Sequence, residues 1–479
     1  MTDSDLTFAS IEEVALLYRR RKVSPVEVTK LMLERVAQLN PKLNAYITVT
    51  EDLALAQAKK AETELFAPRG RKARRDRGAL HGIPISLKDN IYTNGVRTTA
   101  GSKILREFVP LRDADVWAKL KEAGAILLGK TNLHEFAYGV TTNNPHYGPT
   151  RNPWDLTRIP GGSSGGSAAA IAAGLCYGSI GTDTGGSIRI PASLCGVVGL
   201  KPGVGRVSAE GVVPLSPRLD FVGPMARTVA DAALLLAPIF FRGKGEPSVG
   251  SIFKRSTARK FRVGLPKEFF FDVTSDEVHM AFHEAMRSLQ QSGVKLRDIF
   301  IPLLKETEEA GNHIAWAEAT HYHQQAGWFP SRVADYGEDV RTRLEMGTKV
   351  SATAYLQALE TREKFIQKFH LALEEADVDA LVVPTTPIAA PLIGEESTQI
   401  GKDKYPTRAL LLRMNRPANL AGIPAISIPC GYTSTGLPIG LQLIGAGSDE
   451  PLLLQIAQLA QTRLAVLRRP KLNTSALSH

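Results

Sequence analysis

Cysteine is scarce in this chain of 479 residues. There are three, Cys176, Cys195 and Cys430, and each stands among apolar residues. No two of them form a CxxC pair, so the sequence predicts neither a disulfide framework nor a zinc site. His321 and His323 lie two residues apart in a predicted helix, where they cannot face one ion. We therefore predict no metal site.

Long apolar runs are also missing. No run of 18 residues is free of polar interruption, so we expect no transmembrane helix and no membrane partner. The first ten residues, MTDSDLTFAS, are acidic and polar, unlike an ordinary secretory signal. The default expectation is a cytoplasmic protein.

Acidic residues are outnumbered, and the formal net charge is +10. Much of the excess lies in residues 69–77, where six basic residues face one acidic residue and no aromatic residue is interleaved. A nucleic-acid surface usually combines basic side chains with aromatic ones. We therefore interpret residues 69–77 as a solvated loop and expect no nucleic-acid partner.

With 43% hydrophobic residues, the chain can bury a large core. Strand-like and helix-like segments alternate without a fixed repeat, which predicts an α/β fold: one large domain with a mixed, mostly buried β-sheet surrounded by helices. Capping boxes at Ser10 and Ser24 begin two helices, and the second is predicted to end at Asn40-Pro41. Further helices are predicted at 51–66, 116–123, 275–292, 302–325, 352–375 and 451–464, and strands at 45–50, 83–87, 125–129, 261–266, 294–302, 379–386, 424–431 and 436–445.

Glycine and serine are concentrated between Gly161 and Ala192, in GGSSGGSAAAIAAGLCYGSIGTDTGGSIRIPA. Glycine is costly to order, so this density needs a reason. One reason is a backbone that approaches a ligand closely and points N–H groups at negative charge. A flexible linker is the alternative, but a linker would not enclose the helix-like, small-residue segment Ala168–Gly174. We interpret the stretch as a cradle for an anion.

Two familiar patterns occur without their usual context. Gly124–Thr131 matches the phosphate-loop pattern GxxxxGK[ST], but its middle residues, Ala-Ile-Leu-Leu, predict a buried strand. Gly161–Gly165 matches the GxSxG nucleophile elbow, which requires a strand directly before the serine. The preceding RNPWDLTR is loop-like. Neither pattern is taken as functional.

The Gly161–Ala192 stretch resembles the signature of the amidase signature family, the Ser–cis-Ser–Lys amide hydrolases. The similarity continues upstream through HGIPISLKDNI, GKTNLHEFAYG and RNPW, and downstream through CGVVGLKP, GPMARTVADAA, NLAGIPAISIPCG and GLPIGLQLIG. It implies the amidase signature fold as a single domain over 1–479. Within it we predict an N-terminal helical arm (1–68), a signature core (78–235), a more variable mixed region (260–378) and C-terminal strands with a helix (379–479).

The resemblance also implies the site residues. The catalytic lysine of the family falls on Lys88, the bridging serine that follows a cis peptide bond on Ser163, and the nucleophile on Ser187. Backbone N–H groups of the DTGGS segment would form the oxyanion hole: Thr184, Gly185, Gly186 and Ser187. Three neighbours are interpreted as scaffold residues: Ser164, Asp183 and Arg189.

The chemistry agrees with these positions. A serine hydroxyl is a poor nucleophile until a base takes its proton, and lysine is such a base only when it is neutral. Burial lowers the pKa of a lysine, and Lys88 ends the apolar strand PISL. Ser163 can relay the proton and return it to the leaving amine, because a hydroxyl both donates and accepts. The expected reaction is acyl transfer to Ser187 followed by hydrolysis, and it requires no metal or organic cofactor.

The substrate is less clearly marked. Relatives that serve as the glutamine-hydrolysing subunit of a tRNA-dependent amidotransferase use an acid shortly before NLAG, together with an arginine. Arg343 could be that arginine, but no Asp or Glu stands between Thr407 and Gly422. The pair Leu411-Leu412 in that segment favours an uncharged, bulky or aromatic substrate.

We therefore predict a stand-alone amidase, monomeric or homodimeric, that acts on small or aryl amides. One alternative is a carbamate or ester hydrolase with the same triad, and another is the glutamine-hydrolysing amidotransferase subunit. The expected partner is a small-molecule amide or carbamate. Candidate substrate contacts are Tyr138, Phe221 and Arg343.

Overall fold

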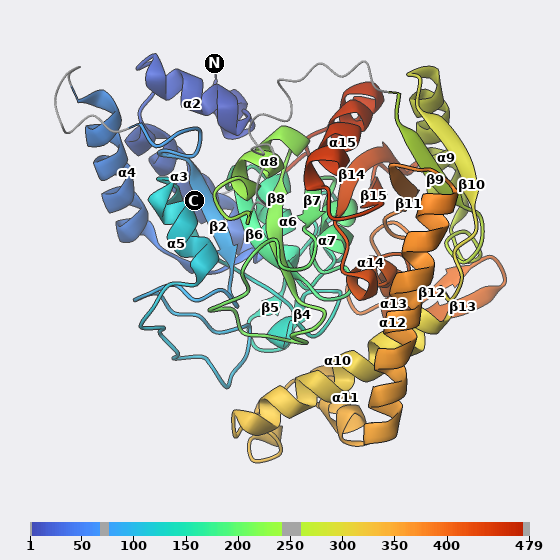
Figure 1. Ribbon diagram of the computed structural model, residues 1–479. Helices are drawn as coiled ribbons and strands as arrows, with labels where there is room; N and C mark the ends of the chain where they lie inside the picture. Colours follow the sequence, from blue (N-terminus) through green and yellow to red (C-terminus); the bar gives the residue numbers. More distant parts are fainter. Residues whose placement is uncertain (1, 68–75, 242–259, 473–479) are drawn as a thin grey trace.

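The computed structural model describes residues 2–67, 76–241 and 260–472. An 11-stranded mixed sheet runs through these residues, and helices lie on both of its faces (Figure 1). The predicted α/β fold, one domain with a mixed sheet surrounded by helices, is confirmed. In spatial order the strands are β1 (Tyr46–Val49), β3 (Ile126–Thr131), β2 (Pro84–Lys88), β6 (Gly178–Asp183), β8 (Phe221–Ala226), β7 (Val198–Lys201), β14 (Ala425–Tyr432), β15 (Pro438–Gly445), β11 (Ala380–Pro384), β9 (Arg262–Pro266) and β10 (Lys295–Ile299).

The helices precede, separate and follow these strands along the chain. They are α1 (Asp3–Thr7), α2 (Ile11–Arg19), α3 (Pro25–Leu43), α4 (Glu51–Phe66), α5 (Asp115–Glu122), α6 (Gly165–Ala172), α7 (Arg189–Cys195), α8 (Val229–Leu236), α9 (Asp276–Gln291), α10 (Glu306–Gln325), α11 (Glu338–Thr348), α12 (Ala352–Glu375), α13 (Thr407–Arg413), α14 (Arg416–Ala421) and α15 (Glu450–Leu464). Helices α1 to α3 and α10 to α12 follow one another without a strand between them. Two short sheets, β4 (Asn143–Asn144) with β5 (Gly148–Pro149) and β12 (Ser397–Ile400) with β13 (Asp403–Pro406), lie outside the main sheet. Among the helices in the described ranges, none has the length and apolar character needed to cross a membrane.

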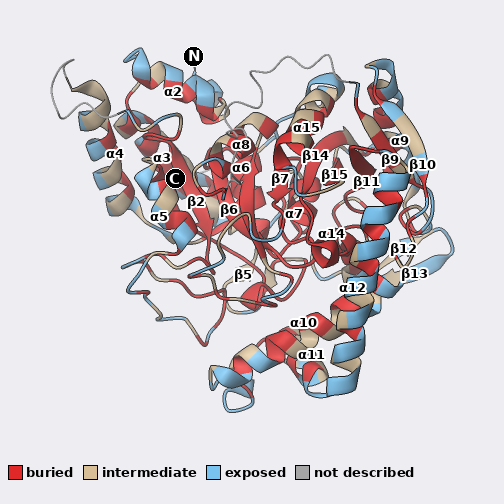
Figure 2. Ribbon diagram, in the orientation of Figure 1, coloured by how far each residue is buried: buried red, intermediate tan, exposed pale blue. Residues whose placement is uncertain are grey.

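The centre of the sheet is buried on both faces. Every residue of β2, β3, β6, β8, β11 and β15 is buried, while exposed residues lie on outer helices such as α4, α9 and α12 (Figure 2). Strand β2 pairs in parallel with β3 and β6, whereas β6 and β8 run antiparallel. Strands covered on both faces are typically continuous apolar runs, which explains why AILLG forms a strand and not a phosphate loop.

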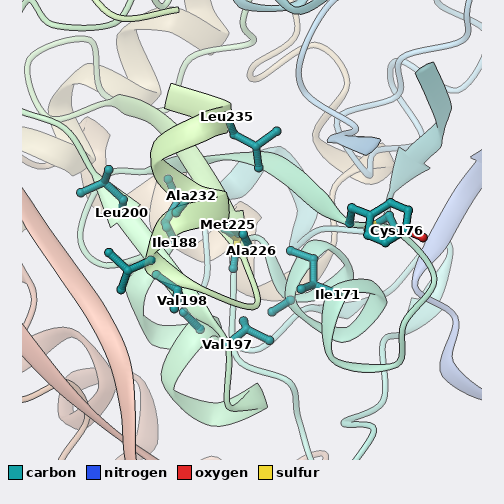
Figure 3. Packing of buried hydrophobic residues seen from close by; sticks show 14 of the residues in the cluster. Ile171, Cys176, Ile188, Val197, Val198, Leu200, Met225, Ala226, Ala232 and Leu235 are labelled. Carbon is teal, nitrogen blue, oxygen red and sulfur yellow. The ribbon is translucent and has the colours of Figure 1, made fainter. Parts of the chain in front are cut away.

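Side chains from three small helices hold the signature region against the sheet. In Figure 3, Ile171 from α6, Ile188 beside α7 and Leu235 from α8 gather with Val198 and Met225 from β7 and β8. All five side chains are fully buried. Burial of a side chain of this size contributes about 1.5–3 kcal/mol, so this cluster gives the glycine-rich loops a rigid support.

Helices α2 and α3 begin where the sequence predicts, but α3 ends later than predicted. Ser10 and Ser24 each cap a helix through the predicted capping box, with Oγ accepting from Glu13 N and Glu27 N at 3.2 Å. The predicted end of α3 at Asn40-Pro41 is wrong, because the helix continues to Leu43. Leu43 is fully buried, and the helix stops only where Asn44 adopts a left-handed conformation with φ of 51°.

Residues 69–75 of the predicted basic loop, which spans 69–77, lie outside the described residues. At its edge, Arg77 Nη2 pairs with Glu64 Oε1 at 2.5 Å. The three cysteines are buried free thiols.

His323 is buried too, with its ring edge-on to Phe136 and its Nδ1 2.8 Å from the Tyr336 hydroxyl.

Gly166 in α6 makes one packing prediction possible. A Cβ on Gly166 would lie 2.4 Å from Asn132 O and 2.5 Å from Ala45 O, and neither backbone atom can move aside easily. We expect Gly166→Ala to lower the free energy of unfolding by about 1–3 kcal/mol, measured by urea denaturation. Gly447→Ala is the control, because its Cβ meets nothing within 4 Å, and it should change stability by less than about 0.5 kcal/mol. Equal stability of the two variants would contradict this packing.

Candidate active site

Lys88 is the last residue of β2 and is fully buried. Its Nζ lies 2.7 Å from Ser163 Oγ and 2.6 Å from Thr182 Oγ1, so two hydroxyls flank the amine. Burial lowers the pKa of Lys88 to about 7, although the nearby Asp220 and Asp183 carboxylates oppose that shift. A lysine with this pKa is partly neutral at physiological pH and can act as a base.

Ser163, which contacts Lys88, and Ser187 come from two loops that lie next to each other. The peptide bond between Gly162 and Ser163 is cis, as the family resemblance implies. Ser187 follows β6 and directly precedes the helical turn into α7. Ser164 N donates to Ser187 O at 3.1 Å and so joins the two loops. Among the described residues, no hydrogen bond links the two hydroxyls themselves.

Asp183 shapes the loop that carries Ser187. Its carboxylate accepts from Gly186 N at 2.8 Å and from Ile188 N at 3.1 Å, and it forms a buried ion pair with Arg189 at 2.9 Å. Burial alone would raise the pKa of Asp183, but the Arg189 guanidinium and the Asn419 amide hold it well below its usual range. The carboxylate is therefore charged, and it fixes the backbone of the loop.

The same contacts bear on the predicted oxyanion hole. The N–H of Gly186 is already donated to Asp183. Within the described chain, no hydrogen bond uses the N–H groups of Thr184, Gly185 or Ser187. Three of the four predicted donors are thus available beside the Ser187 hydroxyl.

Asp220 braces this loop from the other side. Its Oδ1 accepts from Thr184 Oγ1 at 2.5 Å, and its Oδ2 accepts from Leu215 N and Ser216 N at 2.8 and 3.1 Å. Burial raises the pKa of Asp220 to about 6, so the carboxylate is mainly charged at neutral pH. Thr182 and Asp220 were not singled out from the sequence. Thr182 stood in the GTDTGGS motif, but nothing local marked its contact with Lys88.

Ser187 opens onto a small cavity of about 30 Å³. Thr184 and Gly185 line it from the Ser187 loop, and Tyr138 also lines it. The segment 407–416 adds Arg408, Leu412 and Arg416, and α10 adds Gly311 and Ala315. None of the described residues that line this cavity is acidic or a histidine.

Of the three candidate substrate contacts, only Tyr138 lines the cavity. The ring of Phe221 instead covers Lys201, whose Nζ lies 3.6 Å from the ring centroid. Arg343 stands behind Tyr138: its Nη1 donates to Tyr138 O, and it pairs with Asp339 at 3.0 Å. Arg408 and Arg416, which the sequence analysis did not select, occupy the wall instead.

Comparison with known proteins adds an independent observation. The family model described as Amidase matches residues 27–454. The chain belongs to the amidase family. This amidase is 38% identical to a glutamyl-tRNA(Gln) amidotransferase subunit from Carboxydothermus hydrogenoformans over 499 residues, which cover 98% of this chain and 100% of that protein.

Solved structures agree with this assignment. The native peptide amidase from Stenotrophomonas maltophilia is 30% identical to this amidase with a TM-score of 0.81, over 97% of this chain and 98% of that one. The corresponding glutamyl-tRNA(Gln) amidotransferase subunit from Thermotoga maritima is 35% identical with a TM-score of 0.78, over 99% and 100% of the chains. This amidase is therefore a hydrolase that acts on amide carbon–nitrogen bonds.

Proposed function

We propose that this amidase cleaves amides through an acyl-enzyme on Ser187, with Ser163 and Lys88 transferring the proton. The observation that carries the proposal is the fully buried contact of 2.7 Å between Lys88 Nζ and Ser163 Oγ. Lys88, whose pKa is lowered, thus contacts the Ser163 hydroxyl, and the next residue, Ser164, donates a backbone hydrogen bond to Ser187 O.

The proposed mechanism follows from these contacts. Neutral Lys88 accepts the Ser163 proton while Ser163 accepts that of Ser187, whose oxygen attacks the amide carbon. The free N–H groups of Thr184, Gly185 and Ser187 stabilise the tetrahedral oxyanion. Ser163 then protonates the departing amine, and water hydrolyses the ester on Ser187 along the same proton path.

Labelling with a fluorophosphonate tests the nucleophile directly. We expect intact mass spectrometry to show one adduct on the wild-type protein, and peptide mapping to place it on Ser187. Ser187→Ala should carry no adduct. An adduct on another serine, or an equal adduct on Ser187→Ala, would contradict the proposal.

The pH dependence tests the base. We expect kcat/KM to rise with pH through about 7 and to level off above it, because only neutral Lys88 accepts a proton. The Asp220 carboxylate raises the pKa of Lys88, so Asp220→Asn should move the midpoint to lower pH while keeping the rising limb. A flat profile between pH 5 and 9, or a shift to higher pH in Asp220→Asn, would rule out this role for Lys88.

The relatives bear on the finer assignment. Proteins named as this subunit of glutamyl-tRNA(Gln) amidotransferase match essentially the whole chain at 38–40% identity. This similarity supports the glutamine-hydrolysing subunit better than the stand-alone amidase predicted from the sequence. Against it, Leu412 lines the cavity in the segment where an acid was expected.

Ammonia release from glutamine, measured with and without the partner subunits of a tRNA-dependent amidotransferase, separates the two hypotheses. Hydrolysis that appears only with the partners supports the subunit. Partner-independent hydrolysis of small amides, without glutaminase activity, supports the stand-alone enzyme.

A further inference from the structure

Two arginines line the cavity beside Ser187 without an acidic partner. Arg416, at the start of α14, is 7% exposed, and its Nη1 donates to two neutral acceptors, Glu308 O and Asn312 Oδ1, both at 2.9 Å. Arg408, in α13, keeps part of its surface exposed, but its buried Nε has no hydrogen-bond partner. Within the described ranges neither guanidinium forms an ion pair.

Other arginines near the cavity, in contrast, form ion pairs with acidic residues. Arg413, also in α13, pairs with Glu308 at 3.0 Å and lies 3.4 Å from Asp272. Arg343 pairs with Asp339. The acidic residues Glu308, Asp272 and Asp339 therefore pair with arginines that do not line the cavity. Among the described residues, no carboxylate forms an ion pair with Arg408 or Arg416.

Packing brings these charges close to the reacting groups. Helices α10 and α14 lie side by side (Figure 1), and Gly311 of α10 makes room for the Arg416 side chain. A Cβ on Gly311 would lie 2.4 Å from Arg416 Cδ. On the other side, a Cβ on Gly185 would lie 3.9 Å from Arg416 Nε. The guanidinium thus stands next to the loop that carries Ser187.

The positive charges of Arg408 and Arg416 favour the binding of an anionic ligand in the cavity. Burial, together with repulsion from Arg343 and Arg416, lowers the pKa of Arg408 to about 9, which still leaves it charged at neutral pH. Burial lowers the pKa of Arg416 to about 10, although the Glu308 carboxylate opposes that shift. The buried charge of Arg416 has only neutral hydrogen-bond acceptors among the described residues, so an anionic ligand here would gain binding free energy.

Tyr138 supplies a third polar group. It is 1% exposed, and no described residue forms a hydrogen bond with its hydroxyl. Its ring lies under Arg343, and its backbone carbonyl accepts from the same guanidinium, so its position is fixed. A buried hydroxyl without a hydrogen-bond partner destabilises the fold, and a ligand oxygen would supply the missing partner.

We propose that the substrate of this amidase is a small amide that bears a carboxylate, bound by Arg408, Arg416 and the Tyr138 hydroxyl. The inference rests on the proposed function, because it places the carboxylate on the molecule that acylates Ser187. Guanidinium groups bind carboxylates through paired, charge-assisted hydrogen bonds. The small cavity volume favours a compact planar anion, and the absence of an acidic residue among the described lining residues leaves no partner for a substrate ammonium group.

This charge differs from the expectation drawn from Leu411-Leu412. Of that pair only Leu412 lines the cavity, and both leucines belong to an apolar cluster that includes Ile190 and Leu194. The apolar character of this pair therefore reflects packing in the core as well as the lining of the cavity. The positive groups on either side of it define the chemistry of the wall.

Matched amides test the inference. The monoamides of succinic, glutaric and adipic acid are compared with butanamide, pentanamide and hexanamide, in which a methyl group replaces the carboxylate. We expect at least one acid monoamide to have a kcat/KM at least about tenfold above its neutral counterpart, which corresponds to about 1.4 kcal/mol. Arg408→Gln and Arg416→Gln should each bring that ratio close to one. Arg413→Gln, the matched control in the same segment, should keep it.

The outcomes separate the two proposals. If wild-type protein hydrolyses neutral amides as well as their acid counterparts, the carboxylate site is wrong and the acyl-enzyme mechanism stands. If Arg416→Gln lowers both classes equally, the residue acts on the oxyanion or the fold, and the inference is again wrong. Titration calorimetry of Ser187→Ala with the same monoamides gives a readout without turnover. Binding of no acid monoamide would overturn the inference, and absence of fluorophosphonate labelling would overturn the proposed function.

Discussion

Ser187→Ala is expected to lower kcat for amide hydrolysis by at least about 10⁴-fold. The variant cannot form the acyl-enzyme, and loss of one member of a catalytic unit removes nearly the whole effect of that unit. Of the three predicted catalytic residues, Ser187 alone lines the cavity, and it is 5% exposed. Ammonia release from the best substrate of the wild-type protein is the measurement.

A second serine in the neighbouring helix gives the control. Ser193 lies in α7 and is also buried, but its Oγ is 3.1 Å from Thr386 Oγ1 and does not line the cavity. Ser193→Ala should keep at least a tenth of the activity, and both variants should melt within a few degrees of the wild type. Turnover near the wild-type level in Ser187→Ala would refute the nucleophile assignment.

Lys88→Met is expected to lower kcat by at least about 10³-fold and to remove the rise of activity around pH 7. Methionine keeps most of the side-chain volume, so the loss would report the missing base and not a cavity in the core. Lys88→Arg should be equally inactive, because a guanidinium cannot be deprotonated in this pH range.

Lys201 provides a matched buried lysine. Its Nζ donates to Pro202 O at 2.9 Å and contacts no hydroxyl of the site. Burial lowers its pKa well below the usual value, as it does for Lys88. Lys201→Met should keep at least a tenth of the activity with the rising pH limb intact. Retained activity in Lys88→Met with its pH limb preserved would exclude Lys88 as the base.

The sequence was informative wherever a local pattern determined the outcome. The apolar PISL segment predicted a strand that ends at Lys88, and the two glycine-serine clusters predicted a cradle whose backbone N–H groups approach an anion. Capping boxes located the starts of α2 and α3. The end of α3 was missed because tertiary burial of Leu43 carried the helix past Pro41.

Contacts between segments that are far apart in the sequence could not be predicted from local patterns. Arg416 reaches the cavity because α14 packs against α10 and lies next to the Ser187 loop, which is more than 200 residues earlier in the chain than α14. Phe221 was a reasonable candidate on β8, but the register of that strand turns its ring to Lys201. A linear sequence does not carry that register.

Helix α14 holds two different functions three residues apart. Asn419 donates to Asp183 and so helps to fix the loop of the nucleophile, while Arg416 faces the cavity. Positions separated by three residues lie on neighbouring parts of one helix face. If Arg416 binds the substrate carboxylate as proposed, its exchange changes which molecules bind, while Asn419 still holds Asp183 and the loop of the predicted nucleophile. Under the proposed mechanism, substrate choice and the support of the predicted nucleophile loop therefore depend on different residues of this one helix.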